Sequence, residues 1–212
     1  DSAAFYLSKA LPNAQSKLEL ARWEYLIAQM YSLSNQDSLS VLWYEKAINH
    51  TTDPLMDVYA RLNIVSLSSD KKVDAVNFHL TQLLAMAKKE KYQGFRDLIY
   101  YAAAELELRQ DNLKNAENWL NKSISYSEGN SLQKTKSYFL LAETLYKNKK
   151  YIPASAAYDS LTISLLNVEE ANKVNQKKEP LKRIALALKA VNREDSLQRI
   201  ALLPEIEREA LL

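Results

Sequence analysis

The chain has 212 residues, 47% of them apolar, and its 28 Lys and Arg side chains nearly balance 26 Asp and Glu, which leaves a net charge of +2. Two glycines and five prolines are too few for a turn-rich all-β fold or a Gly-rich phosphate loop, and the absence of cysteine excludes disulfides, thiol nucleophiles and thiolate metal sites. The composition predicts an all-α protein with a packed core that is not built to bind a polyanion.

The N-terminal stretch DSAAFYLSKAL has a helical pattern from its first residues, and Pro12 follows it. We interpret residues 1–20 as the second helix of a truncated preceding repeat followed by a linker, and the chain as a segment cut from a longer protein. No run of about 18 apolar residues, the length that spans a membrane, and no signal sequence is present. The composition leaves the cellular compartment open.

The first complete helix pair is predicted over residues 24–48. Ala28 is the small residue on its first helix, and Ser40 takes the matching position on the second, which continues with Tyr44 and Ala47. Side chains this small allow two antiparallel helices to approach closely, while bulky neighbours fill the grooves.

A weaker copy of the pair is predicted over residues 56–89. Either Ala75 or Val76 fits the small position of its second helix, so its register is open by one residue. The apolar residues that suggest the two helices are Tyr59, Leu62 and Leu67 on the first and Val73, Val76, Leu80, Leu83 and Leu84 on the second.

Two further copies, over residues 99–124 and 140–161, agree closely with each other. Their small residues are 38 positions apart (142 − 104 and 154 − 116), as Ala104 matches Ala142 and Ala116 matches Ala154. In the last copy, Lys147–Lys150 forms the turn, and Pro153 lies in the first turn of the second helix, where a missing N–H is tolerated.

A helix pair that recurs at this spacing is the signature of a helical solenoid. The small residue on each helix, with Tyr or Leu around it, resembles the tetratricopeptide repeat over residues 21–168, which we divide into four repeats. Alanine replaces the glycine common in that family's first helix, at Ala28, Ala104 and Ala142, and favours helix more strongly. The predicted fold is an all-α, right-handed solenoid of tetratricopeptide-like helix pairs.

Residues 169–212 are expected to form a C-terminal helical cap, because the end units of a stacked array are atypical. Three short helices are predicted there, over residues 179–192, 195–203 and 205–212. Pro180 and Pro204 suggest helix starts, and Asp195 suggests an N-cap.

No residue pattern points to catalysis, a cofactor or a metal. The two histidines, His50 and His79, have no second histidine or carboxylate at ligand spacing, so we interpret both as structural.

Lysine clusters near residues 88–91, 147–150 and 177–178 fall in turns or at helix ends. Compensation of helix dipoles and solubility explain them better than nucleic-acid contact. The sequence predicts a protein that is not an enzyme and does not bind nucleic acid.

The predicted partner-binding surface is the groove lined by the first helices, which is where solenoids usually bind. Its aromatic residues and charges of both signs suit a protein or peptide partner, although tyrosines at helical spacing also pack between neighbouring helices. The candidate residues are Arg22, Tyr25, Gln29, Tyr101, Glu105, Arg109, Lys136, Phe139, Glu143 and Tyr146.

One tetratricopeptide subtype clamps a partner's C-terminal carboxylate with Lys and Asn at set groove positions. Those positions hold Tyr25, Gln29 and Leu98 here, so we expect no such clamp.

The tail EDSLQRIALLPEIEREALL, residues 194–212, resembles a segment of Bacteroidota envelope proteins, the large tetratricopeptide lipoproteins of the type IX secretion and gliding-motility machinery (the SprE/PorW family). The resemblance implies a periplasmic scaffold that a lipid holds at the outer membrane, with secretion-machinery components as partners. A cytoplasmic location stays open.

The alternatives to a secretion scaffold are a sensor or adaptor segment of a signalling protein such as a histidine kinase, and an enzyme or lipid-binding solenoid. A deep apolar pocket with converging polar groups would favour the last of these.

Overall fold

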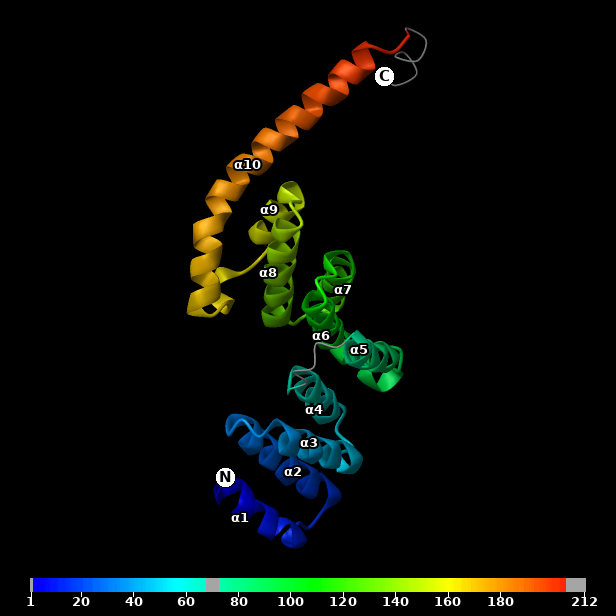
Figure 1. Cartoon of the computed structure of the whole chain (residues 1–212), viewed down its shortest axis with the longest axis vertical. Helices are drawn as coiled ribbons and strands as arrows, with labels where there is room; N and C mark the ends of the chain where they lie inside the picture. Colours follow the sequence, from blue (N-terminus) through cyan, green and yellow to red (C-terminus); the bar gives the residue numbers. More distant parts are fainter. Residues whose placement is uncertain (1, 68–72, 205–212) are drawn as a thin grey trace. The chain divides into compact units, whose positions relative to one another are not determined.

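The computed structural model describes residues 2–67 and 73–204, and all regular structure within these ranges is helical. The chain divides into two compact units, residues 1–126 and 127–212. The helices of the first unit (Figure 1) are α1 (Ser2–Ala10), α2 (Lys17–Leu33), α3 (Asp37–His50), α4 (Pro54–Leu67), α5 (Val73–Ala87), α6 (Arg96–Arg109) and α7 (Leu113–Tyr126), with 3₁₀ segments η1 (Leu11–Asn13) and η2 (Glu90–Phe95). The second unit contains α8 (Ser131–Lys147), α9 (Tyr151–Asp159), η3 (Ile163–Leu165) and α10 (Val168–Ala201).

Within each unit, helices that follow one another in the sequence pack together, except α4 and α5. The dividing point between the units falls inside the predicted array of residues 21–168. The domain boundaries proposed from the repeats, 1–20, 21–168 and 169–212, remain predictions.

Three of the four predicted helix pairs are close pairs: α2 with α3, α6 with α7, and α8 with α9. The residues predicted as close-approach points are all completely buried, namely Ala28, Ser40, Ala104, Ala116, Ala142 and Ala154. In the first pair the Ser40 hydroxyl donates a 2.8 Å hydrogen bond to the carbonyl of Ala28, the small residue of the facing helix. A small polar residue is therefore accommodated at the closest contact because its one donor is satisfied.

The turns of these three pairs share one backbone geometry. Each has a residue in the left-handed region, Asn35, Asp111 or Lys149, with φ of 56°, 57° and 57°. Each also has the Schellman hydrogen bond from the next amide back to the helix, in the pairs Gln36 to Tyr31, Asn112 to Glu107 and Lys150 to Leu145, at 2.9, 3.0 and 2.9 Å. The last two turns are 38 residues apart, as the repeat predicts. Non-glycine residues fill a position that glycine usually takes.

The turn geometry predicts that Lys149→Gly stabilises the protein. The left-handed conformation costs a lysine about 1–2 kcal/mol, and glycine's greater freedom in the unfolded chain offsets about 0.4–1 kcal/mol of that gain. Urea unfolding should therefore show a net gain of about 0.5–1 kcal/mol. Lys150→Gly is the matched control, because Lys150 has an ordinary φ of −86°. A Lys149→Gly protein no more stable than Lys150→Gly would contradict the argument.

The prediction that residues 56–89 form a fourth close pair is wrong. Both helices exist, but α4 packs against α3 and η2, whereas α5 packs against α6 and η2. Val76 rather than Ala75 is buried on α5, and on α4 the buried apolar residues are Val58, Ala60 and Val65 in place of the predicted Tyr59 stripe.

The 38-residue spacing explains why α4 and α5 do not form a close pair. Shifted by 38, the close-approach points Ala28 and Ser40 fall on Ser66 and Phe78. A phenyl ring cannot occupy a point where two helix backbones nearly touch, and Phe78 is instead 59% exposed.

Helix α4 connects two apolar clusters among the described residues of the first unit. Its Ala60 packs with Ala28 and Tyr44 of α2 and α3. Its Val58 and Val65 join the larger core, whose other buried members are Val76, Leu83, Met86, Ala87, Tyr92, Ile99, Ala102 and Leu106. The first unit therefore holds together through α4 rather than through an α4–α5 hairpin.

Within the described residues, the predicted division of the C-terminal region into short helices is also wrong, whereas its role as a cap remains a prediction. A single helix, α10, runs from Val168 to Ala201, so Pro180 and Asp195 are inside a helix and do not start one. A capping box between Asn167 and Glu170 starts the helix. Its buried residues, Val174, Leu181 and Ala185, share one face, and the helix packs against α9. This burial carries the helix through Pro180 despite the lost hydrogen bond. The predicted helix over residues 205–212 lies outside the described residues.

The close packing in the second unit predicts that Ala154→Leu is strongly destabilising. Ala154 is completely buried between α9 and its neighbours, and added methylenes in a filled core cost about 1–3 kcal/mol. Ala156→Leu is the control, two residues along α9 at an exposed position. Thermal unfolding of both variants measures the difference. Equal effects would show that Ala154 is not a close-approach point.

Candidate functional site

The ten residues predicted to line a groove are divided among three helices. Six are on α2 and α6 in the first unit, and Lys136, Phe139, Glu143 and Tyr146 are on α8 in the second. Arg22, Gln29, Glu105, Arg109, Lys136 and Tyr146 are exposed, and the others are partly buried. That they form one groove therefore remains a prediction.

Several of these residues hold helices together. The Tyr25 ring packs edge-on against Tyr44, 5.1 Å away between centroids, and the Asn63 amide donates to both hydroxyls at 3.0 and 3.1 Å. Burial raises the pKa of Tyr25, and it raises the pKa of Tyr44 to about 12 with help from the neighbouring Tyr25. The Arg109 guanidinium donates to the Val65 carbonyl at 3.1 Å, which links α6 to α4. For these tyrosines, packing between helices, the alternative to groove contact, agrees with the structure.

Glu143 on α8 is also used inside its unit. It accepts hydrogen bonds from the Tyr158 hydroxyl and from the Lys177 ammonium at 2.6 and 2.9 Å. Burial and the Glu143 carboxylate both raise the pKa of Tyr158. The same ammonium lies 5.0 Å from the centre of the Tyr146 ring. These contacts attach α10 to α8, so Glu143 is a structural residue of the second unit.

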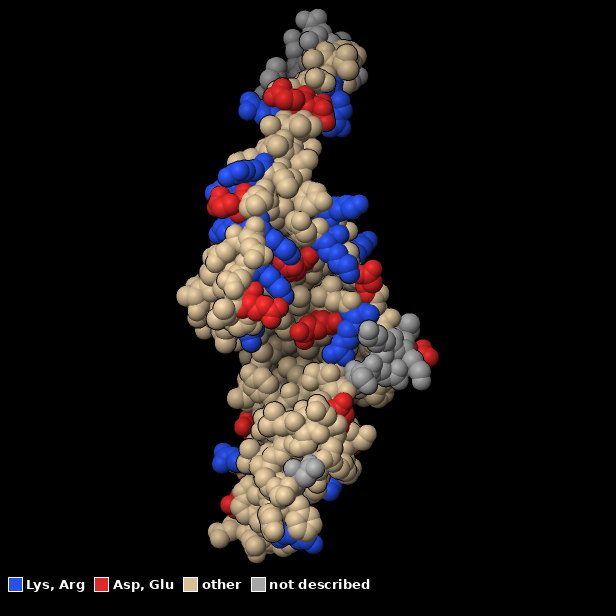
Figure 2. Space-filling model, turned by 60° about the vertical axis from the view of Figure 1, so that its left-hand side comes forward, with Lys and Arg blue, Asp and Glu red and all other residues tan. Residues whose placement is uncertain are grey.

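The lysine clusters likewise have internal partners that the sequence did not reveal. Lys91 pairs with Asp57 at 3.1 Å, and Lys178 pairs with Asp159 at 3.2 Å. On the face of the molecule in Figure 2, basic and acidic side chains are interleaved rather than gathered in patches of one sign. This distribution agrees with the interpretation that these lysines aid solubility. The placement of Lys177 and Lys178 in a turn or at a helix end is wrong, because both lie inside α10, where dipole compensation does not apply.

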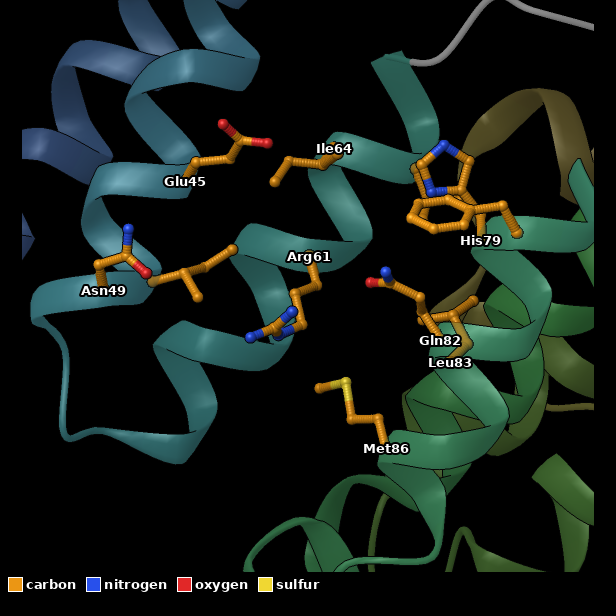
Figure 3. Close-up of a pocket in the computed structure, with 11 residues that line it drawn as sticks. Glu45, Asn49, Arg61, Ile64, His79, Gln82, Leu83 and Met86 are labelled. Carbon is orange, nitrogen blue, oxygen red and sulfur yellow. The ribbon is translucent and has the colours of Figure 1, made fainter. Parts of the chain in front are cut away.

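A cleft in the first unit lies between α3, α4 and α5, with a volume of about 370 Å³. Figure 3 shows Glu45 and Asn49 of α3 on one side, with His79, Gln82 and Met86 of α5 on the other. Arg61 and Ile64 of α4 lie between them. The lining residues are Glu45, Ile48, Asn49, Arg61, Ile64, Val65, Phe78, His79, Gln82, Leu83 and Met86.

The cleft exists because α4 and α5 do not close on each other. Val65, Leu83 and Met86 are buried and make an apolar floor, while Phe78 stands exposed at the edge. None of the ten predicted groove residues lines it. The sequence feature that could have indicated this cleft is Phe78, because it occupies a position where the repeat requires a small residue.

A second, smaller hollow of about 180 Å³ shares Arg61, Gln82 and Met86 with the cleft and also reaches Lys89 and Tyr92. The cleft therefore continues along α5 toward its C-terminal end. We call the two hollows together the α5 groove.

A buried carboxylate fixes this end of the groove. Asp57 is 6% exposed and binds Arg61 Nε at 2.7 Å, Lys91 Nζ at 3.1 Å and the Tyr92 hydroxyl. Burial alone would raise the pKa of Asp57, but the hydrogen bonds from Tyr92, Lys91 and Arg61 outweigh it and lower that pKa. The network joins α4 to η2 and orients Arg61 in the groove.

The two histidines differ in role. His50 Nδ1 lies 2.7 Å from the buried carboxylate of Glu24, across the α2–α3 pair, in agreement with a structural role. His79 lines the cleft. Burial lowers its pKa, and the charge of Arg109 lowers it further, so the ring is neutral at pH 7 and can donate or accept a hydrogen bond.

The described residues contain no group of three or more His, Asp or Glu side chains that could hold a metal ion. Within the same residues, no helix has both the length and the apolar character needed to span a bilayer.

In comparisons with known proteins, the sequence matches no protein-family model and no curated protein. The candidate site is therefore defined by its own geometry.

The Asp57 network predicts that Tyr92→Phe destabilises the protein. Losing a hydrogen bond to a charged group costs about 1.5–3 kcal/mol. Tyr59→Phe on α4 is the control, because Tyr59 is 41% exposed. Urea unfolding should separate the two variants at pH 7. Similar losses would mean that the bond to Asp57 is not stabilising.

The same network predicts the acid dependence of stability. Because folding lowers the pKa of Asp57, its contribution is complete above the unfolded pKa of about 3.9 and is lost as the pH falls through the lower folded value. Asp57→Asn should remove this part of the acid transition. An unchanged acid profile in that variant would contradict the assignment.

Proposed function

We propose that this chain is a non-catalytic protein-interaction module, built as a right-handed solenoid of tetratricopeptide-like helix pairs. The observation that carries the proposal is the α5 groove. Its apolar floor is bordered by polar side chains of both charges, and this combination suits a protein partner. The three close pairs with identical turns support the solenoid, because each pair needs a neighbour to bury its remaining apolar face.

An enzyme or lipid-binding role would call for an enclosed pocket with converging polar groups. The groove instead is open to solvent, and its Glu45, Asn49 and Gln82 side chains are exposed at the rim. The geometry therefore favours a surface that receives part of another protein.

We further propose that the parent protein is a scaffold of the type IX secretion and gliding machinery, periplasmic and associated with the outer membrane. The support is the similarity of residues 194–212 to that family, and part of this tail, 205–212, lies outside the described residues. A sensor or adaptor segment of a signalling protein is the alternative, and a cytoplasmic location would accompany it.

Site-specific cross-linking tests the interaction role. The chain contains no cysteine, so Gln82→Cys places a single photoreactive label in the groove and Asn118→Cys places one at an exposed position of α7. We expect the Gln82 label, but not the Asn118 label, to cross-link a defined protein from an extract of the source organism. Excess unlabelled chain should compete.

Envelope and cytosolic extracts, tested separately, address the location of the partner. A cross-link confined to the envelope supports the secretion scaffold, and one confined to the cytosol supports the signalling alternative. Equal labelling from both positions, or none from Gln82, would contradict an interaction role for the groove.

A further inference from the structure

We infer that the α5 groove binds a short peptide segment in which a large aliphatic or aromatic side chain is next to acidic residues. The inference rests on the proposed interaction function and adds the chemistry of the partner. It follows from three properties of the groove: its floor, its unpaired amides and its charge.

The floor accepts a large apolar side chain. Leu83, Met86 and Val65 are 2%, 5% and 7% exposed, and Ile48 and Ile64 are partly buried beside them. At about 370 Å³, the cleft is at the small end of ligand pockets, which span about 300–1,000 Å³. This size suits one or two side chains of a peptide rather than a folded surface. Met86 adds a flexible wall that adapts to the anchor.

The rim can hold a peptide backbone. Asn49 on α3 and Gln82 on α5 line opposite sides of the cleft (Figure 3). An amide side chain both donates and accepts, as a peptide bond does. Both side chains are exposed, and neither amide makes a hydrogen bond within the described part of the chain. Each is therefore available to an extended peptide.

The end of the groove near η2 carries excess positive charge. Arg61 and Lys89 line the hollow there, whereas Lys88 and Glu90 do not. Lys91 joins Arg61 at the Asp57 carboxylate, so the network and Lys89 together bring three cations to one carboxylate. Arg61 and Lys91 share Asp57, whereas the Lys89 ammonium makes no ion pair with any residue that the structure describes. An acidic residue of the peptide would form an ion pair with the Lys89 ammonium and lie near the Arg61 guanidinium.

Selection from a library of random twelve-residue peptides on phage tests this chemistry, with the whole chain as the target. We expect the selected peptides to share an aliphatic or aromatic residue next to Asp or Glu. Selection on Lys89→Glu should lose the acidic preference. Lys88→Glu is the matched control, since Lys88 is the adjacent exposed lysine and does not line the groove.

Fluorescence anisotropy with one selected peptide measures how much each substitution changes the binding affinity. Lys89→Glu should weaken binding about three- to tenfold, because the variant loses an exposed ion pair and adds repulsion between like charges. Phe78→Ala, at an exposed edge residue, should weaken binding also. Lys88→Glu should change it less than twofold, and circular dichroism should show that all variants fold.

Peptides selected without an acidic preference, or equal losses in Lys88→Glu and Lys89→Glu, would overturn the inference. So would a failure to select any peptide on the folded chain. The interaction role would stand or fall separately, because the Gln82 cross-link needs no knowledge of the partner's chemistry.

Discussion

The fold depends on close approach between paired helices at small residues. At Ala28 and Ser40 the two helices are near enough for the Ser40 hydroxyl to reach a backbone carbonyl of its neighbour. Ala104 with Ala116, and Ala142 with Ala154, repeat the arrangement at a spacing of 38. Any larger side chain at these points would separate the helices and expose the apolar residues on either side. The common turn geometry follows, because each pair needs the same sharp reversal.

The α5 groove, on which the proposed function rests, lies where the requirement for small residues at the helix contact is not met. Phe78 occupies a position that requires a small residue, and α4 accordingly packs with α3 on one side and η2 on the other. The Asp57 network then does what a close helix contact does elsewhere, since the hydrogen bonds from Lys91 and Tyr92 to the Asp57 carboxylate join η2 to α4. The space between α4 and α5 remains as the α5 groove. The interruption of the helix-pair pattern thus leaves a groove without disturbing the close pairs.

Much of the fold could be predicted from the sequence, because local spacing determines it. The all-α class, the six small residues and the helix start near Pro153 all follow from helical periodicity and are confirmed. Long-range contacts could not be predicted in this way. Nothing near Glu143 in the sequence indicates that Lys177 binds it, and Pro180 gave the wrong boundary because the burial of Leu181 outweighs a local signal. The site was missed for a related reason, as its lining comes from three helices and includes none of the ten residues predicted to line a groove.

Disulfide formation between engineered cysteines tests the central claim most directly, since a disulfide requires Cα atoms within about 7 Å. The double variant Ala28→Cys with Ser40→Cys probes a close pair, and Ser66→Cys with Phe78→Cys probes the equivalent positions of α4 and α5. The chain has no other cysteine, so mild oxidation and thiol counting give a clear readout. We predict rapid bond formation in the first variant and none in the second. Equally rapid oxidation of both would show that α4 and α5 close like the other pairs and that the groove does not exist.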